Sequence, residues 1–231
     1  MILHIPHSST DTLDKEFLCD LTLELERMTD TDTDKLFQCD NATKVIFPIS
    51  RLICDVERFE DDHIEVMAKK GMGVCYTTNS FGGVLRNVGE DERAEIIDKY
   101  YRPHHQKLTE AVEEELNTKN RALIVDCHSF SNIPLPHEES KTERTDICIG
   151  IDDFHTSESL SDSAVNYFRS CGYSVALNDP FAGTLIPMKY YQNDKRVKGI
   201  MIEVNRDLYQ SNFSEVQRDI SVWLNEVLLE F

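Results

Sequence analysis

Short apolar runs rich in β-branched residues alternate along the chain with longer segments whose apolar residues recur every three or four positions. This alternation is typical of strands that are joined through helices into a largely parallel sheet. The predicted strands cover residues 1–5, 44–48, 73–76, 121–127, 145–151, 173–177 and 199–204. The predicted helices cover residues 15–28, 91–117 with an interruption or kink at Pro103, 159–170 and 215–229. The expected fold class is α/β.

No internal repeat, low-complexity tract or Pro/Gly/Ser-rich linker divides the 231 residues. We therefore predict a single domain over residues 1–231. The polar segment 129–144 is the best candidate for a mobile loop.

The charge balance limits the classes of partner. The chain has 42 acidic and 24 basic residues, a formal net charge of −18. We therefore expect no nucleic acid or membrane partner, and any small anionic substrate has to be met by local arginines. The start, MILHIPHSST, lacks the layout of a signal peptide, and no apolar run is long enough to span a bilayer, so we predict a cytoplasmic protein. The seven cysteines form no CxxC pair and are expected to be reduced.

Polar side chains capable of chemistry follow several of the predicted strands. His7 follows the first strand, Asp126 and His128 end the strand at 121–127, and Glu203 lies in the last strand. Because ligands of open α/β sheets bind outside the carboxyl ends of the strands, we expect these side chains to converge.

Two imidazoles and one carboxylate, with one position open to water, make a hydrolytic zinc site. We predict one divalent ion, zinc, on His7, His128 and Asp30, with Asp126 orienting the His128 ring. The third ligand is open among Asp30, Asp32, Asp34 and Asp55. The alternative is that the histidines only end strands and that the acids of residues 29–34 cap a helix.

Glu203 lies inside the apolar strand sequence IMIEV. Burial should raise its pKa toward neutrality, which suits a general base that takes the proton of a water molecule. The alternative is a buried ion pair with Arg206.

The segment 50–59 concentrates two arginines and two acids over a short apolar stretch. The planar forks of Arg51 and Arg58 could clamp the carboxylates of an anionic substrate, with Asp55 and Glu57 holding the forks or the substrate amide. An internal ion-pair network is the alternative.

Five segments together resemble the N-formylglutamate amidohydrolase family: residues 4–9 (HIPHSS), 29–37, 50–58, 126–129 (DCHS) and 202–206 (IEVNR). The resemblance runs from residue 1 to about residue 209. That family is similar to zinc carboxypeptidases and aspartoacylases, which implies a three-layer fold with a mixed, largely parallel sheet flanked by helices.

The resemblance implies His7 and His128 as metal ligands, Glu203 as the group that activates water, and Arg51 and Arg58 as holders of substrate carboxylate. Glu57 and Arg206 are further candidates for substrate binding. Glu57 stands where the wider group often has asparagine, and no HxxE follows His7.

The predicted function is hydrolysis of N-formyl-L-glutamate to formate and L-glutamate by a cytoplasmic zinc amidohydrolase of histidine degradation. Another N-acyl amino acid, a short acidic peptide and a non-catalytic carboxylate-binding protein stay open as alternatives. The sequence leaves the oligomeric state open, with a monomer as the simplest case.

Overall fold

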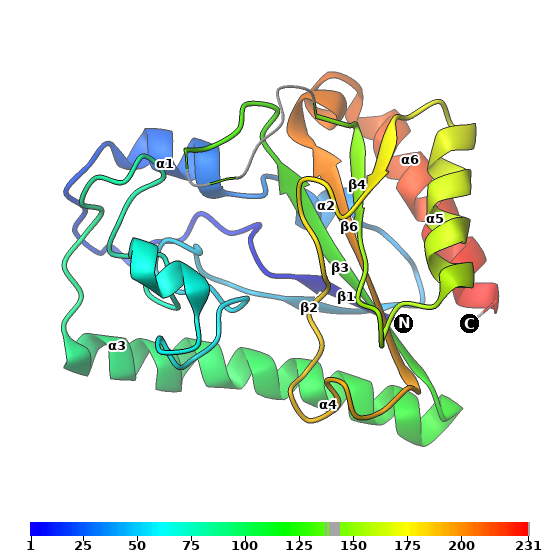
Figure 1. Cartoon of the computed structure of the whole chain (residues 1–231), viewed down its shortest axis with the longest axis horizontal. Helices are drawn as coiled ribbons and strands as arrows, with labels where there is room; N and C mark the ends of the chain where they lie inside the picture. Colours follow the sequence, from blue (N-terminus) through cyan, green and yellow to red (C-terminus); the bar gives the residue numbers. More distant parts are fainter. Residues whose placement is uncertain (137, 139–143, 231) are drawn as a thin grey trace.

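The computed structural model describes residues 1–136, 138 and 144–230. Within these residues a six-stranded sheet has the order β2-β1-β3-β6-β4-β5 (Figure 1). The strands are β1 (Ile2–Ile5), β2 (Thr43–Ile46), β3 (Ala122–Phe130), β4 (Ile147–Gly150), β5 (Val175–Leu177) and β6 (Val197–Asn205). Neighbouring strands run parallel except β4 and β6, which are antiparallel. The predicted α/β fold with a mixed, largely parallel sheet is confirmed.

Helices cover both faces of the sheet. They are α1 (Leu21–Met28), α2 (Thr33–Leu36), the 3₁₀ helix η1 (Val66–Lys70), α3 (Glu90–Ile96), the π-helical turn η2 (Ile97–Tyr101), α4 (Arg102–Lys119), α5 (Glu158–Ser170) and α6 (Arg206–Glu230). In Figure 1, α3 and α4 form one long rod along one side of the sheet, and α5 and α6 lie on the other side. None of the helices in the described part of the chain is long and apolar enough to cross a membrane.

The alternation of side chains along β3 determines which face of the sheet carries the polar site residues. Val125 and Cys127 pack into the core that includes α5 and α6, whereas Ile124 packs into the core against α4. Because successive side chains of a strand point to opposite faces, Asp126 and His128 lie on the α4 face. The same alternation in β6 places Glu203 on that face, since its neighbour Ile202 lies in the α5–α6 core.

The predicted helix at 15–28 begins later than expected, at Leu21. The side chain of Asp20 accepts hydrogen bonds from the backbone N–H groups of Thr22 and Leu23 and so caps the helix there. Leu18, which fitted the apolar spacing, is 62% exposed. The regular spacing of apolar residues before Asp20 therefore does not correspond to a helix.

The predicted strand at 73–76 is wrong. Val74 and Tyr76 are buried, but the segment is irregular and contributes only an isolated bridge between Met72 and Tyr76. The carbonyl of Val74 accepts a hydrogen bond from the backbone N–H of Asp55. The apolar run therefore packs against the 50–58 segment and does not join the sheet.

The long helix predicted at 91–117 is interrupted by η2, just before Pro103, and resumes as α4. Pro103 has no backbone N–H and so removes one helical hydrogen bond at this place, and the N–H of Arg102 donates to the carbonyl of Ile97, five residues earlier. The last helix begins at Arg206, earlier than the predicted residue 215, and bends at Asn212, which has non-helical φ and ψ angles. The loop predicted at 129–144 lies partly outside the described residues, and Ser129 and Phe130 belong to β3.

Candidate functional site

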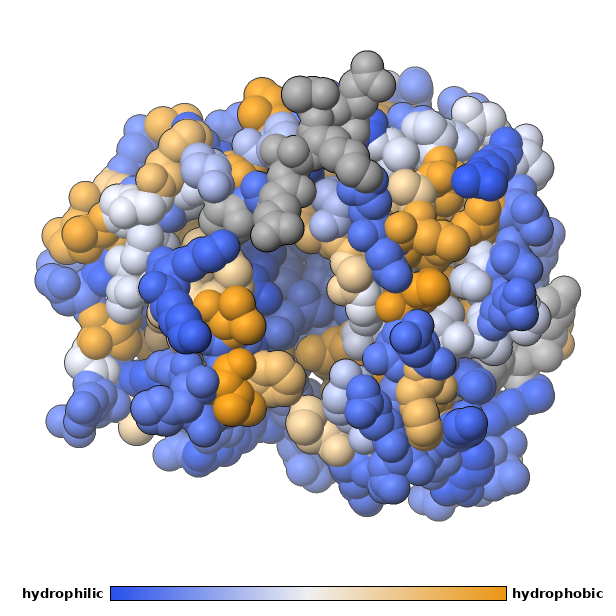
Figure 2. Space-filling model, in the orientation of Figure 1, coloured by the Kyte–Doolittle hydropathy of each residue, from blue (hydrophilic) through white to orange (hydrophobic). Residues whose placement is uncertain are grey.

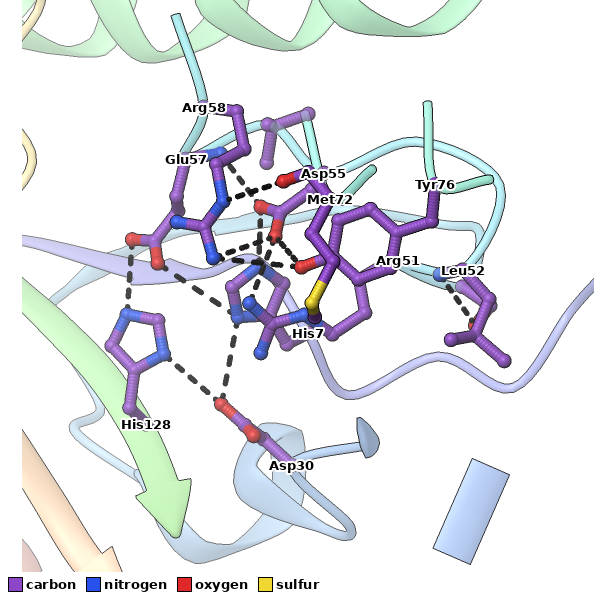
Figure 3. A network of polar contacts seen from close by, with 12 residues as sticks. His7, Asp30, Arg51, Leu52, Asp55, Glu57, Arg58, Met72, Tyr76 and His128 are labelled. Carbon is purple, nitrogen blue, oxygen red and sulfur yellow. Dashed lines mark hydrogen bonds and ion pairs between the residues drawn. The ribbon is translucent and has the colours of Figure 1, made fainter. Parts of the chain in front are cut away.

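The predicted site residues gather at the carboxyl ends of β1, β3 and β6, beside the 50–58 segment (Figure 3). Eight of these ten residues line a cavity of about 310 Å³. The lining residues that the sequence singled out are His7, Asp30, Arg51, Glu57, Arg58, His128, Glu203 and Arg206. The structure therefore brings the candidate ligands, base and arginines into one place.

His7 and His128 face each other across this cavity, with ring centroids 5.2 Å apart. Both side chains are buried. One carboxylate oxygen, Oδ2 of Asp30, lies 3.0 Å from Nδ1 of His128 and 3.7 Å from Nδ1 of His7 (Figure 3). Asp30 is therefore one carboxylate within reach of both rings.

The remaining ring nitrogens are held by other acids. Nε2 of His7 lies 2.9 Å from Oδ1 of Asp55, and Nε2 of His128 lies 3.2 Å from Oδ1 of Asp126. A carboxylate on the far nitrogen fixes the tautomer and the ring orientation of a metal-binding histidine. The geometry suits Asp55 and Asp126 for this orienting role.

Glu57 is a second acid within reach of both histidines. Its Oε1 lies 3.0 Å from Nε2 of His128, and its Oε2 lies 3.8 Å from Nδ1 of His7. The ligand atoms of His7, Glu57 and His128 all lie within 4.8 Å of one another. Among the described residues, the group that meets this spacing and contains both histidines is completed by Glu57, while Asp30 is the other acid that contacts both rings.

The donor set fits a divalent cation. Nδ1 of His7 is buried and has no hydrogen-bond partner among the described residues. Five carboxyl groups and two of the guanidinium groups of the site lie close to the two rings, and carboxylate oxygens are ligands that zinc accepts. These groups are Asp30, Asp55, Glu57, Asp126, Glu203, Arg51 and Arg58.

Two shifts in pKa follow from this crowding. Burial opposes ionisation of Asp30, but hydrogen bonds and charge from His128 and His7 hold its pKa below the usual value. Burial also opposes protonation of His128, yet the charges of Glu57 and Asp126 raise its pKa well above the usual value. Both shifts arise from the same contacts between the acids and the rings, and a cation bound at the rings would take the place of the proton on His128.

Glu203 is buried at the end of β6, beside His128 in the register of β3 and β6. Burial, followed by the charges of Asp30 and Glu57, raises its pKa to about 8, against the opposing charge of His128. Its Oε2 has no hydrogen-bond partner within the described part of the chain. A carboxyl group in this state can take and return a proton near neutral pH.

Asp55 ties the two candidate arginines to the site. Its Oδ2 accepts hydrogen bonds from Nη2 of Arg51 at 2.8 Å and from the hydroxyl of Tyr76 at 2.6 Å, and it lies 3.6 Å from Nη2 of Arg58. Burial opposes ionisation, but the charges of Arg51 and Arg58 hold the pKa of Asp55 well below its usual value. The guanidinium groups are therefore positioned by an acid that also orients His7.

The guanidinium group of Arg206 binds backbone carbonyl groups. Its Nη1 and Nη2 donate to the carbonyls of Glu26 and Arg27, each at 2.8 Å. These bonds join the start of α6 to the end of α1. Nε has no hydrogen-bond partner among the described residues, and each Nη keeps a second N–H.

The sequence interpretation missed a buried pair of histidines behind His128. Nδ1 of His4 lies 2.7 Å from Oδ1 of Asp126, and its Nε2 lies 2.9 Å from Nε2 of His104 in α4. His4 is the register partner of Asp126, so the spacing of His4 and Asp126 within their strands could have predicted the contact. The pair extends the polar network from the cavity into the α4 face.

Comparison with known proteins gives one family. A family model described as N-formylglutamate amidohydrolase matches residues 1–210. The crystal structure of N-formylglutamate amidohydrolase from Ralstonia eutropha JMP134 is similar with a TM-score of 0.80 at 23% identity, covering 98% of this chain and 91% of that chain. A gene product from Agrobacterium tumefaciens is similar with a TM-score of 0.71 at 20% identity, covering 100% and 88%. The search of curated proteins gives no match. At these identities the solved structures support the fold.

Proposed function

Because the chain belongs to the N-formylglutamate amidohydrolase family, a group of enzymes that hydrolyse a linear amide, we propose that it cleaves N-formyl-L-glutamate to formate and L-glutamate with a bound divalent metal ion. The similar enzyme from Ralstonia eutropha carries the same substrate in its name. The observation that carries the proposal is the convergence of His7 and His128 with two acids, Asp30 and Glu57, in one cavity.

His7, Asp30 and His128 would hold the ion. The nitrogen and oxygen donors of these side chains suit zinc. Asp55 and Asp126 would orient the two rings from their far nitrogens. When bound, the ion would polarise the formyl carbonyl and lower the pKa of a water molecule.

Glu203 would move the proton. Its carboxylate accepts a proton from the attacking water as the water oxygen bonds to the formyl carbon. The same group then donates that proton to the departing nitrogen as the carbon–nitrogen bond breaks. A pKa near 8 leaves both protonation states accessible around neutral pH.

Arg51 and Arg58 would hold the carboxylates of glutamate. Both guanidinium groups reach the cavity while Asp55 fixes their position. Glu57, which lies between Arg58 and His128 (Figure 3), would accept from the amide N–H of the substrate. Arg206 would be a further contact, since two of its five N–H groups bind backbone carbonyls.

The test is a formate-release assay on the purified protein with N-formyl-L-glutamate, before and after removal of metal with a chelator. The proposal expects turnover that is lost with the metal and restored by zinc. Turnover that survives complete metal removal would contradict the metal role, and absence of turnover in the metal-loaded protein would contradict the substrate.

The remaining expectations stay predictions. They are a cytoplasmic location, a role in histidine degradation, a monomeric state, and a small anionic molecule as partner rather than a nucleic acid or a membrane. The formal charge of −18 supports the choice of partner.

A further inference from the structure

A second cavity, of about 320 Å³, adjoins the one that holds His7, His128 and Glu203. The two cavities share four lining residues, Glu57, Arg58, Ala182 and Met201. Figure 2 shows a hydrophilic recess near the middle of one face, with hydrophobic side chains on its border. Because the shared residues belong to both walls, a ligand in the first cavity can extend into the second.

The outer wall of the second cavity is apolar. It includes Phe59, Leu185, Ile186, Met188 and Tyr191. Three of these are exposed despite their size, with exposed fractions of 45% for Phe59, 67% for Met188 and 37% for Tyr191. Large apolar side chains that line a cavity and stay open to solvent favour an apolar occupant.

The charges of the two cavities differ. Arginine side chains line the first cavity at four positions, Arg27, Arg51, Arg58 and Arg206. Among the described residues that line the second, Arg58 is the only lysine or arginine, and it already lies 3.6 Å from Asp55. Glu57 and Asp126 also line the second cavity, so a carboxylate there would meet like charge. The second cavity therefore suits an uncharged group.

Two other polar lining groups already have partners. Nε2 of His105 donates to the carbonyl of Val56 at 2.9 Å, and the hydroxyl of Tyr101 donates to the carbonyl of Arg58 at 2.7 Å. The hydroxyl of Thr184 has no partner among the described residues and is a neutral group that an uncharged ligand can contact. An apolar cavity of about 150 Å³ is enough to hold benzene, so this one has room for an aromatic ring.

We propose that the second cavity binds an uncharged, apolar acyl group, so that the substrates include N-acyl-L-glutamates whose acyl group is larger than formyl and reaches the size of benzoyl. This inference rests on the proposed amidohydrolase function. A formyl group carries only hydrogen on its carbonyl carbon and leaves the second cavity empty. With a larger acyl group the reaction is the same: water oxygen bonds to the acyl carbon, the carbon–nitrogen bond breaks, and the water proton passes to the amine.

The experiment compares the N-formyl, N-acetyl, N-butyryl and N-benzoyl derivatives of L-glutamate as substrates of the metal-loaded protein. We expect hydrolysis of the benzoyl compound with a kcat/KM within about tenfold of that for the formyl compound. Met188→Asn, at the mouth of the cavity, should raise KM for the benzoyl compound about fivefold and leave the formyl compound unchanged. The matched control is Val66→Asn, since Val66 is 72% exposed and lines neither cavity.

Hydrolysis of the formyl compound alone would overturn the inference and leave the proposed function intact, as would an equal effect of Met188→Asn on both compounds. Absence of turnover with every compound would instead remove the proposed function. Calorimetric binding of N-benzoyl-L-glutamate then decides: binding that Met188→Asn weakens supports the cavity assignment, and no binding, or binding that the variant leaves unchanged, overturns it.

Discussion

Oδ2 of Asp30 lies 3.0 Å from Nδ1 of His128, in a carboxylate that is almost fully buried. The same oxygen faces Nδ1 of His7, which places Asp30 between the two rings. Glu57 also contacts both rings, and its ligand atom lies within 4.8 Å of those of His7 and His128. Asp30 and Glu57 are therefore the two candidates for the third metal ligand, and we propose Asp30.

Asp30→Asn should therefore lower zinc affinity by on the order of 100-fold or more, because a neutral amide replaces an anionic ligand. Glu57→Gln is the matched comparison and should lower the affinity by no more than about tenfold. Zinc titration against a competing chelator measures both. The reverse order of effects would assign the third ligand to Glu57. Circular dichroism of the metal-free variants checks that both fold.

Glu203→Gln should keep the metal and lower kcat by roughly 10² to 10⁴, the range for loss of a general acid–base group. Glutamine preserves the shape of the side chain but cannot carry the proton. The control is Glu113→Gln, whose side chain is 40% exposed and pairs with Lys189 on the surface. Activity close to that of the unmodified protein would remove Glu203 from the proton transfer.

The pH dependence of kcat/KM should show a rising limb as Glu203 ionises. Its pKa is about 8 without metal, and a nearby cation favours the carboxylate, so the limb should lie at or below pH 8. The residual activity of Glu203→Gln should lack this limb. A profile of the same shape in both proteins would mean that another group controls the limb.

Arg58→Lys should raise KM for N-formyl-L-glutamate by about tenfold or more and change kcat less, because lysine cannot form the planar two-point contact with a carboxylate. Arg102→Lys is the control, since Arg102 pairs with Glu60 on an exposed part of α4. Steady-state kinetics separate the two parameters. A fall in kcat with an unchanged KM would contradict a role in holding the substrate.

His104 should make stability sensitive to acid. Burial, followed by the charges of His4 and His105, lowers its pKa to about 2, so the folded protein keeps it neutral. In the unfolded chain a histidine has a pKa of about 6.5 and binds a proton below it. As the pH falls below that value, the free energy of unfolding therefore decreases by about 1.4 kcal/mol per pH unit.

Urea unfolding between pH 4 and 6 tests this assignment. His104→Gln should reduce the slope of the free energy of unfolding against pH by about 1.4 kcal/mol per pH unit. His63→Gln is the control and should leave the slope unchanged, because His63 is exposed. An equal slope in His104→Gln and the unmodified protein would show that His104 does not stay neutral in the fold.

The sequence predicted the fold class and the convergence of the polar side chains, for a physical reason. His128 and Glu203 belong to parallel strands and His7 follows a third, and the carboxyl ends of these strands meet at one edge. Apolar runs identify such strands well. Register then follows from alternation, which places Asp126 and His128 on one face.

Features that depend on contacts between distant residues were not predictable. The bond between His4 and His104 joins a strand to a helix about a hundred residues later, and nothing local to either residue signals it. The engagement of Arg206 by two carbonyls at the end of α1 is of the same kind. The burial of the irregular segment at 73–76 likewise depends on tertiary packing, which overrode the local propensity for a strand.

The most direct test of the metal site is anomalous X-ray scattering at the zinc absorption edge from crystals of the zinc-loaded protein. The account predicts one peak, about 2.0 to 2.2 Å from Nδ1 of His7, Nδ1 of His128 and a carboxylate oxygen of Asp30. No peak between His7 and His128, or a peak that neither histidine contacts, would contradict it.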